Sequence, residues 1–354
     1  MFGYFLLMPV LPLYARRLGL SGSQIGIVIG AFALSSMMLR PWAGWASDRH
    51  GRRPLMFIGG AVFMLAPLGY GVSAGVVSMT LARLFHGAGM GVYPTAATAM
   101  AADLAPPAHR AETLGLFGMS GSIAMALGPA TGIALSRSLG FVPLFVVATV
   151  IGVLALALTT TVPETAPARG TAPFTLRATL SRSAIFPSLL VLGMMLTYGA
   201  LISFLPLHAD ARGLNPGLFF LVYALALTAV RQAAGRLSDR HGRAPVAAAG
   251  LVIVSAGLVI VTLSDSMIGL LVAGLVYGIG QGAANPALIA WCVDGAASGE
   301  RGRAMGTFYT ALELGIAIGA MTAGLAVARA GFTTTFLVAA GIALVAAILA
   351  VTRV

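Results

Sequence analysis

Residues 44–53 read GWASDRHGRR, and residues 235–243 repeat most of this stretch as GRLSDRHGR. Each copy follows one long apolar run and precedes another, so each is predicted to be a short polar turn between two membrane helices. Gly51 and Gly242 are the turn residues that can adopt a positive φ without steric cost. The arginines of both turns indicate the cytoplasmic side of the membrane, where positive charge is retained.

The composition places the chain in a membrane. Only 9% of the residues are charged and 58% are hydrophobic, with a mean hydropathy of +0.95, whereas about a quarter of an ordinary soluble domain is charged. The net charge of +11 does not indicate nucleic-acid binding, because the arginines lie mostly in short loops between apolar runs. Cys292 is the single cysteine, which excludes an intrachain disulfide framework. The sequence contains no metal-ligand cluster and no cofactor motif.

Twelve apolar segments are candidates for membrane helices. The first would span only about 22 Å at 1.5 Å per residue, less than the roughly 30 Å of a bilayer core, so we expect this segment to be incomplete here. The stretch between the sixth and the seventh segment is charged and rich in proline. The segments lie near residues 1–15, 22–44, 54–73, 77–101, 112–136, 141–162, 185–207, 215–236, 245–263, 267–291, 303–328 and 332–352.

The two halves of the chain are internal repeats with an offset of 191 residues (235 − 44). We therefore predict an all-α membrane protein with twelve transmembrane helices in two pseudo-symmetric six-helix bundles, residues 1–162 and 185–354, joined by a cytoplasmic linker at 163–184. Six is an even number, so both bundles share one orientation and a midplane site lies between them. The arginine placement predicts that both termini are cytoplasmic. The offset pairs Arg231 with Arg40, Asp239 with Asp48, Asp294 with Asp103, and Gly278, Gly280 and Gly282 with Gly87, Gly89 and Gly91.

These features resemble the major facilitator superfamily over essentially the whole chain. The loop signature of that family, Gly-x-x-x-Asp-Arg-x-Gly-Arg-Arg, is matched fully at residues 44–53, and the second copy departs only at Ala244. Arg83 with its trailing glycines is similar to the fourth-helix pattern of the family. The resemblance implies a secondary transporter that needs no cofactor. We expect a monomer in the lipid bilayer whose partners are a small molecule and protons, not nucleic acid.

Within that family the chain is most similar to the 12-helix drug/proton antiporters, the multidrug or arabinose-efflux-like group. Their first-helix pattern, Gly-x5-Pro-x-x-Pro, is present as Gly3, Pro9 and Pro12. The resemblance implies efflux of a drug-like molecule or a metabolite by proton antiport, with alternating access, through the cell inner membrane. The fifth-helix pattern of these antiporters reads here Gly115, Ala124, Gly128, Pro129, Gly132, Ile133, so two of its glycines are replaced.

Ionisable residues within the bilayer are costly and usually functional. The other acids fall near segment ends or in loops, which leaves Glu313, about 15 Å along its helix from Arg303 and near the midplane. We expect Glu313 to carry the coupling proton; the alternative is a protonated acid bonded to a neighbouring helix. His86 lies one turn after Arg83, so the two share a face and are further candidates for proton coupling. A neutral histidine bonded to a backbone carbonyl is the alternative for His86.

Three further groups of residues are candidates for gating, bending and substrate contact. Carboxylates at the inner ends can form ion pairs that join the halves, or can be simple topology charges. A Gly-Pro pair kinks a helix and allows close approach, which suits a rocking interface. Polar residues at depth line a cavity or bond helices together. The gating set is Gly44, Asp48, Arg49, Gly51, Arg52, Asp103, Asp239, Arg240, Gly242 and Asp294; the hinge set is Gly128, Pro129 and Gly132; the cavity set is Tyr4, Met119, Tyr198, Gln281, Asn285 and Tyr309.

Two other functions are weighed against export. Proton symport of a sugar or another metabolite into the cell is an alternative, because one fold serves both directions. A membrane enzyme would need a nucleophile–base pair or metal ligands at depth, and the sequence offers neither. The cavity-lining segments carry few fixed charges, which favours a lipophilic or amphiphilic substrate over a sugar phosphate.

Overall fold

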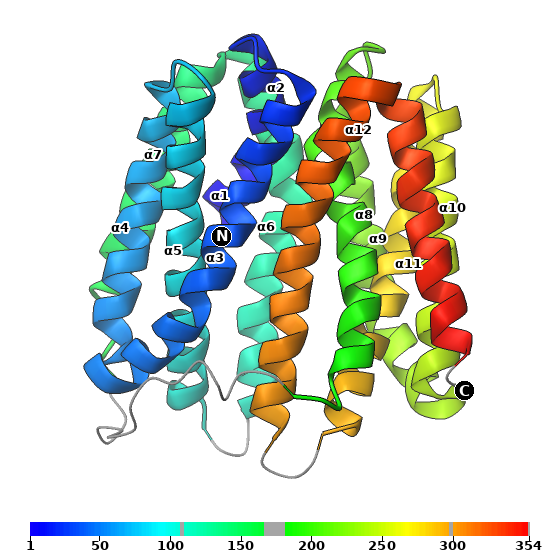
Figure 1. Cartoon of the computed structure of the whole chain (residues 1–354). Coiled ribbons are helices and arrows are strands. Elements are labelled where there is room, and N and C mark those ends of the chain that lie inside the picture. Colours follow the sequence, from blue (N-terminus) through cyan, green and yellow to red (C-terminus); the bar gives the residue numbers. More distant parts are fainter. Residues whose placement is uncertain (107–109, 166–180, 297–299, 353–354) are drawn as a thin grey trace. The chain divides into compact units, whose positions relative to one another are not determined.

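The computed structural model of the chain describes residues 1–106, 110–165, 181–296 and 300–352. Within these ranges every regular element is an α-helix (Figure 1). Nine of the described helices are long and apolar enough to cross a membrane. The prediction of an all-helical membrane chain is therefore confirmed.

The helices follow one another with short connections. Before the segment 166–180, which lies outside the described residues, they are α1 (Phe2–Leu7), α2 (Val10–Arg17), α3 (Gly22–His50), α4 (Arg52–Gly71), α5 (Val76–Leu104), α6 (Arg110–Ser138) and α7 (Phe141–Thr159). After it they are α8 (Ile185–Asp210), α9 (Pro216–His241), α10 (Arg243–Leu263), α11 (Met267–Asp294) and α12 (Arg301–Val351).

The first apolar segment forms two short helices instead of one. The break falls between α1 and α2, where Pro9 takes the position that caps α2. Proline has no N–H to donate and its ring clashes with the carbonyl four residues earlier, so a helix cannot continue through it undisturbed. The predicted apolar segment 1–15 is therefore divided into two helices at Pro9.

The last two predicted segments, 303–328 and 332–352, are merged in α12, which runs from Arg301 to Val351. Gly331 has φ 77° and ψ 177°, so the helical geometry stops there and resumes after it. Only glycine takes that conformation without strain. Figure 1 shows the chain reversing its direction at this point, so α12 consists of two antiparallel arms.

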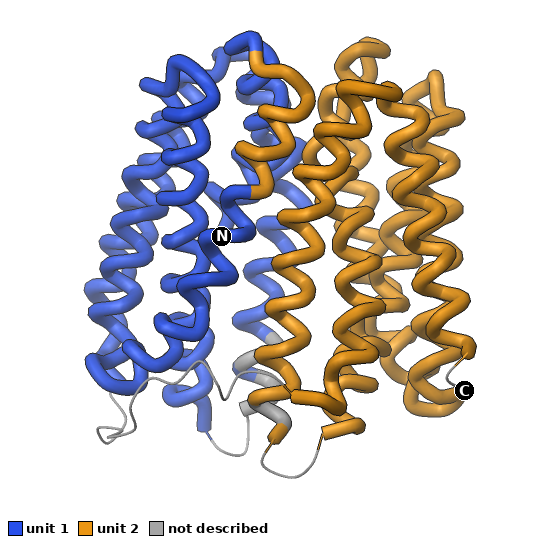
Figure 2. The backbone as a smooth tube through the Cα atoms, in the orientation of Figure 1, with its two compact units in different colours: residues 1–19, 31–176 blue, residues 20–30, 177–354 orange. Residues whose placement is uncertain are grey.

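The chain divides into two compact units (Figure 2). Unit 1 comprises residues 1–19 and 31–176, and unit 2 comprises residues 20–30 and 177–354. The middle of the predicted linker, 166–180, lies outside the described residues. Each unit has its own apolar core: one cluster in unit 1 includes Leu55, Val92 and Met100, and one in unit 2 includes Leu251 and Phe308.

Helix packing repeats in both units with the offset of 191 residues. Gly87 of α5 lies against the backbone carbonyl of Phe32 in α3, and Gly278 of α11 lies against that of Tyr223 in α9. A Cβ at either glycine would overlap the carbonyl oxygen, so the close approach requires glycine. The internal repeat predicted from sequence is therefore present as repeated contacts. Further pairs are Gly91–Ser36 and Gly282–Leu227, Gly59–Tyr93 and Gly250–Ala284, and Gly128–Phe5 and Gly319–Leu196.

Candidate functional site

In unit 1 Arg52, which follows the α3–α4 turn, hydrogen-bonds three polar side chains. Arg52 donates from Nε to Asp103 Oδ2 (3.1 Å), at the end of α5, and from Nη1 to Ser47 Oγ (3.1 Å) and to Asp48. The residue is only 8% exposed. Gly51 has φ 102°, which confirms the expected positive φ of the turn.

Unit 2 builds the same arrangement from the second copy of the loop. Arg243, which is 191 positions after Arg52, donates from Nε to Asp294 Oδ2 (2.8 Å), and from Nη1 to Ser238 Oγ (3.3 Å) and to Asp239. Gly242 has φ 91°. The expected gating carboxylates are therefore paired within their own units.

Arg49 and Arg240 of the gating set do not take part in these two clusters in the described contacts. The Arg49 guanidinium lies 5.4 Å from the centroid of the Trp45 ring. Gly44 and Gly235, which open the two loops, have open space where a Cβ would be. Ion pairs that join the two halves stay a prediction.

Aromatic side chains surround His86 of α5. It is 1% exposed, and the hydroxyl of Tyr70 lies 2.9 Å from its Nδ1. The rings of Tyr4, Phe32 and Phe63 meet the imidazole edge to face at 5.2–6.1 Å. The partner of His86 is thus a tyrosine hydroxyl of another helix, not the backbone carbonyl weighed in the sequence analysis.

Arg83 shares this face with His86, as their spacing predicts. Its guanidinium lies 4.4 Å from the centroid of the Phe32 ring, a cation–π contact. Arg83 and His86 therefore both pack on Phe32 inside unit 1.

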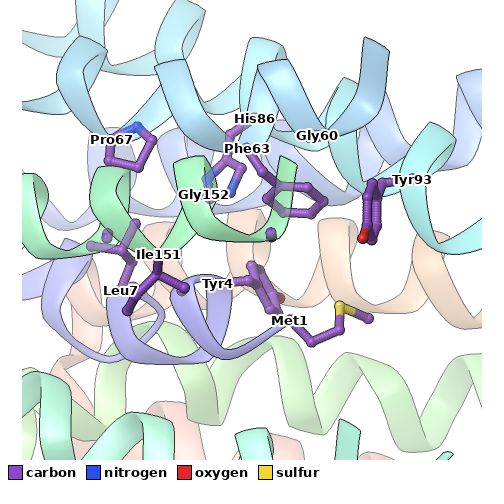
Figure 3. Close-up of a pocket in the computed structure, with 13 residues that line it drawn as sticks. Met1, Tyr4, Leu7, Gly60, Phe63, Pro67, His86, Tyr93, Ile151 and Gly152 are labelled. Carbon is purple, nitrogen blue, oxygen red and sulfur yellow. The ribbon is translucent and has the colours of Figure 1, made fainter. Parts of the chain in front are cut away.

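A cavity of about 60 Å³ lies beside His86 and is lined by residues of unit 1 (Figure 3). Its volume holds several water-sized groups, since one water needs about 10–15 Å³ on the same measure. The ring of His86 points into it, with Phe63 and Tyr4 close by. The lining residues are Met1, Gly3, Tyr4, Leu7, Gly60, Phe63, Pro67, His86, Tyr93, Ala148, Ile151, Gly152 and Ala155.

In unit 2 three of the expected cavity residues lie in one polar and aromatic cluster. Tyr223 of α9 donates to Gln281 of α11 and its ring stacks on Tyr198 of α8 at 6.2 Å. Asn285, one turn after Gln281, has a buried Oδ1 without a hydrogen-bond partner among the described residues. Tyr223 was not predicted from the sequence; it lies 191 residues after Phe32, the ring that contacts Arg83 and His86 in unit 1.

Glu313 lies on the first arm of α12, which packs along α8. Its side chain is buried, at 9% exposure. Gly315, two residues on, lies against Leu192 and Met195 of α8. The Glu313 side chain is thus largely shielded from solvent.

The other predicted residues divide between a helix interface and exposed faces. Gly128 and Gly132 of α6 lie against the backbone of α1 at Phe5 and Leu6, and Pro129 lies within the same helix. The expected close approach is therefore present, while a hinge motion stays a prediction. Met119 and Tyr309 are 56% and 41% exposed.

Comparison with known proteins agrees with this arrangement of membrane helices. The sequence model of the Major Facilitator Superfamily matches residues 1–233 and 216–354. The human organic anion transporter MFSD10 (TETRAN) has a similar structure, with a TM-score of 0.70 and 22% identity, over 99% of this chain and 95% of that one. The fold is thus that of a membrane transporter.

Two curated relatives complete the comparison. The quinolone resistance protein NorA of Staphylococcus aureus is 32% identical over 130 residues, which are 37% of this chain and 34% of NorA. An uncharacterised MFS-type transporter of Methanocaldococcus jannaschii is 21% identical over 92% of this chain and 87% of its own length. The match thus spans about a third of NorA. The chain belongs to the Major Facilitator Superfamily and is a multi-pass membrane transporter that resembles its drug-efflux members.

Proposed function

We propose that this transporter exports a small organic molecule in exchange for protons, by alternating access of two six-helix halves to the two sides of the membrane. The halves are residues 1–162 and 185–354, joined by the linker 163–184. In this scheme α1 and α2 together make the first of twelve crossings, and the two arms of α12 make the last two. The chain acts as a monomer in the cytoplasmic membrane with both termini inside.

The observation that carries the proposal is the burial of Glu313 in a membrane helix of a chain that resembles NorA. An acid in apolar surroundings is costly when ionised, so it favours the protonated form and releases the proton when water reaches it. In the proposed cycle Glu313 takes up a proton from outside and releases it inside. Substrate moves the other way, because proton and substrate exclude one another from one binding region.

The repeated arginine clusters support the gating part of the cycle. Arg52 and Arg243 each fix the inner ends of helices within one unit. Such rigid ends let each half move as one body. Exposed ion pairs of about 0–1 kcal/mol each bias the equilibrium between the inward-open and outward-open states without fixing it in one of them. Small shifts occur across the close contact of α6 with α1, which is formed by Gly128, Pro129 and Gly132.

The test uses the full chain in liposomes with a fluorescent quinolone as the probe. Liposomes with a preset orientation and an imposed proton gradient should accumulate the quinolone only in the export direction. The Glu313→Gln variant should lose gradient-driven transport and keep quinolone counterflow, which needs no proton. The Glu300→Gln variant, at an exposed acid that pairs with Arg303, is the matched control and should transport normally.

Two outcomes contradict the proposal in different ways. Gradient-driven transport that is unchanged in Glu313→Gln would remove this acid from the coupling step. Accumulation only in the opposite orientation would make the chain an importer of the symport kind.

A further inference from the structure

The end of α8 in unit 2 contains a buried histidine that the proposed transport cycle does not use. His208 is 1% exposed, although it lies only two residues before the end of α8 at Asp210. The rings of Phe332 and Phe336 lie just after the reversal of α12 at Gly331, and their centroids are 5.5 and 5.4 Å from that of the imidazole. His208 therefore joins the end of α8 to the start of the second arm of α12.

The hydrogen-bond partner of His208 determines which ring nitrogen carries the hydrogen. Nη1 of Arg212, in the α8–α9 loop (residues 211–215), lies 3.0 Å from His208 Nδ1. A guanidinium has N–H donors and no acceptor, so Nδ1 must accept in this hydrogen bond. The hydrogen of the neutral imidazole is then on Nε2. The opposite tautomer would place two hydrogens between the same two nitrogens.

Two adjoining loops supply the charged groups that face His208. One is Arg212, and the other is Asp265 of the α10–α11 loop, whose Oδ1 accepts from Arg212 Nε (3.0 Å). Asp210, on the same helix, is exposed, and α10 presents the backbone carbonyl of Val261. The Asp265 side chain is 85% exposed, and an exposed ion pair contributes little to stability. The buried imidazole is therefore the stronger of the two described attachments of Arg212.

A second proton on the imidazole would abolish this attachment. Nδ1 would become a donor and would face the Nη1 donor of Arg212, with a positive charge on each of the two groups. Like charges at this distance repel, so the guanidinium must leave His208. The loop that carries it is held to α8 by backbone hydrogen bonds from the Arg212 and Leu214 N–H groups to the Ala209 carbonyl (3.0 and 2.9 Å). Release of the side chain removes a support from these bonds.

We propose that His208 is an acid-sensitive site that releases the α8–α9 loop when its Nδ1 binds a proton. The group displaced by that proton is the guanidinium of Arg212. In the orientation of the proposed function this loop lies outside the cell, on the side from which the export cycle takes its protons, so the side that is sensed rests on that function. Acid outside the cell loosens this end of unit 2, and neutral pH keeps it fixed.

Hydrogen exchange of the purified full chain in lipid nanodiscs, at pH 7.5 and at pH 4, tests the release of the loop. After correction for intrinsic rates, protection of the Arg212 and Leu214 amides should fall roughly tenfold at pH 4, the effect of losing one hydrogen bond to a charged group. His208→Asn places an oxygen near the position of Nδ1 that accepts from Arg212 at either pH, so protection should not depend on pH. A response that persists in His208→Asn, or is absent from the wild type, would overturn the proposal.

Variants of the adjoining loops test the same contact if His208→Asn does not fold. Arg212→Met removes the guanidinium, at a side chain that is 30% exposed, so the loop should exchange at pH 7.5 as the wild type does at pH 4. Wild-type protection in this variant would overturn the proposal. Asp265→Asn should keep the pH response, and its loss there would assign the titration to the aspartate and overturn the role of His208. Arg329→Met, at an exposed arginine of α12, is the matched control and should respond like the wild type.

The side of the membrane and the export cycle are tested separately. Ala211→Cys, at an exposed residue, should react with a membrane-impermeant maleimide in intact cells, whereas Cys292 is buried and should not react. Labelling only after permeabilisation would overturn the outer location of the site. Quinolone export without the pH response would overturn the acid-sensitive site alone. The pH response in a protein that shows no proton-driven transport would overturn the export cycle alone.

Discussion

The middle of α5 in unit 1 and the middle of α11 in unit 2 occupy equivalent positions, yet they carry different chemistry. His86 packs on Phe32 in unit 1, with ring centroids 5.3 Å apart. At the same offset Tyr277 packs on Tyr223 in unit 2, with centroids 5.8 Å apart. The backbone contact beneath them is the same in both units, so the scaffold has been kept while its polar groups have diverged.

In the inner loops, by contrast, the polar contacts are the same in both units. Arg52 and Arg243 make the same set of contacts, with a serine and two aspartates each. In unit 1 the Glu164 carboxylate also accepts from the backbone N–H of Arg52 (2.9 Å) and Arg53 (3.1 Å) at the start of α4. Duplicated contacts therefore hold each unit together, while the polar groups in the middle of α5 and α11 differ.

Substitution of the contact glycines should lower the unfolding free energy more than any other change at equivalent positions of the two units. Gly87→Ala and Gly278→Ala should each destabilise the chain by about 2–3 kcal/mol, since the added Cβ overlaps a backbone carbonyl that cannot easily move. Gly341→Ala, where a Cβ meets open space, should be neutral or stabilising by up to about 1 kcal/mol. Reversible unfolding in bicelles measures the three values. A cost at Gly87 without one at Gly278 would show that the two contacts are not equivalent.

The loop arginines give the next largest effect. Arg52→Gln should cost about 2 kcal/mol, because a buried, charge-assisted hydrogen-bond donor is lost. Arg243→Gln should cost about 1 kcal/mol, because the Arg243 side chain is 25% exposed against 10% for Arg52. The same unfolding measurement ranks them. The reverse order would mean that burial does not decide the strength of these clusters.

The Glu164 carboxylate at the start of α4 sharpens the comparison. Glu164→Gln should destabilise unit 1 by about 1 kcal/mol, since the negative charge at the start of α4 interacts favourably with the free N–H groups there. Hydrogen exchange of the first amides of α4 should rise, while those of α10 should stay unchanged. Equal changes at both helix starts would contradict a local effect.

The smallest effect is expected at the arginines outside the clusters. Arg49→Gln and Arg240→Gln should each change the unfolding free energy by less than about 0.5 kcal/mol, the usual range for exposed charges. If these residues gate the inner mouth, the quinolone transport rate should nevertheless change. Wild-type rates in both variants would remove them from the gating set.

The scaffold could be predicted from sequence because it depends on regular spacing. The offset of 191 residues identified the equivalent loops and paired the glycines of α5 with those of α11, and counting along the helix from Arg303 gave the predicted midplane position of Glu313. Position along one helix is enough for such inferences, since rise per residue and turn angle are fixed.

The partners of the polar groups were not predictable because they come from other helices. Nothing in the spacing of α5 indicates that Tyr70 of α4 bonds His86, or that Arg52 reaches Asp103. The break at Pro9 was a missed local signal, because the proline was read as part of a family pattern and not as an interruption of the helix.

The 2.9 Å contact between the Tyr70 hydroxyl and His86 Nδ1 also links α4 to α5 among the aromatic rings around the imidazole. Loss of that hydroxyl in Tyr70→Phe would leave a buried imidazole nitrogen without its partner, which costs free energy. The orientation of the His86 ring therefore depends on a residue of the preceding helix.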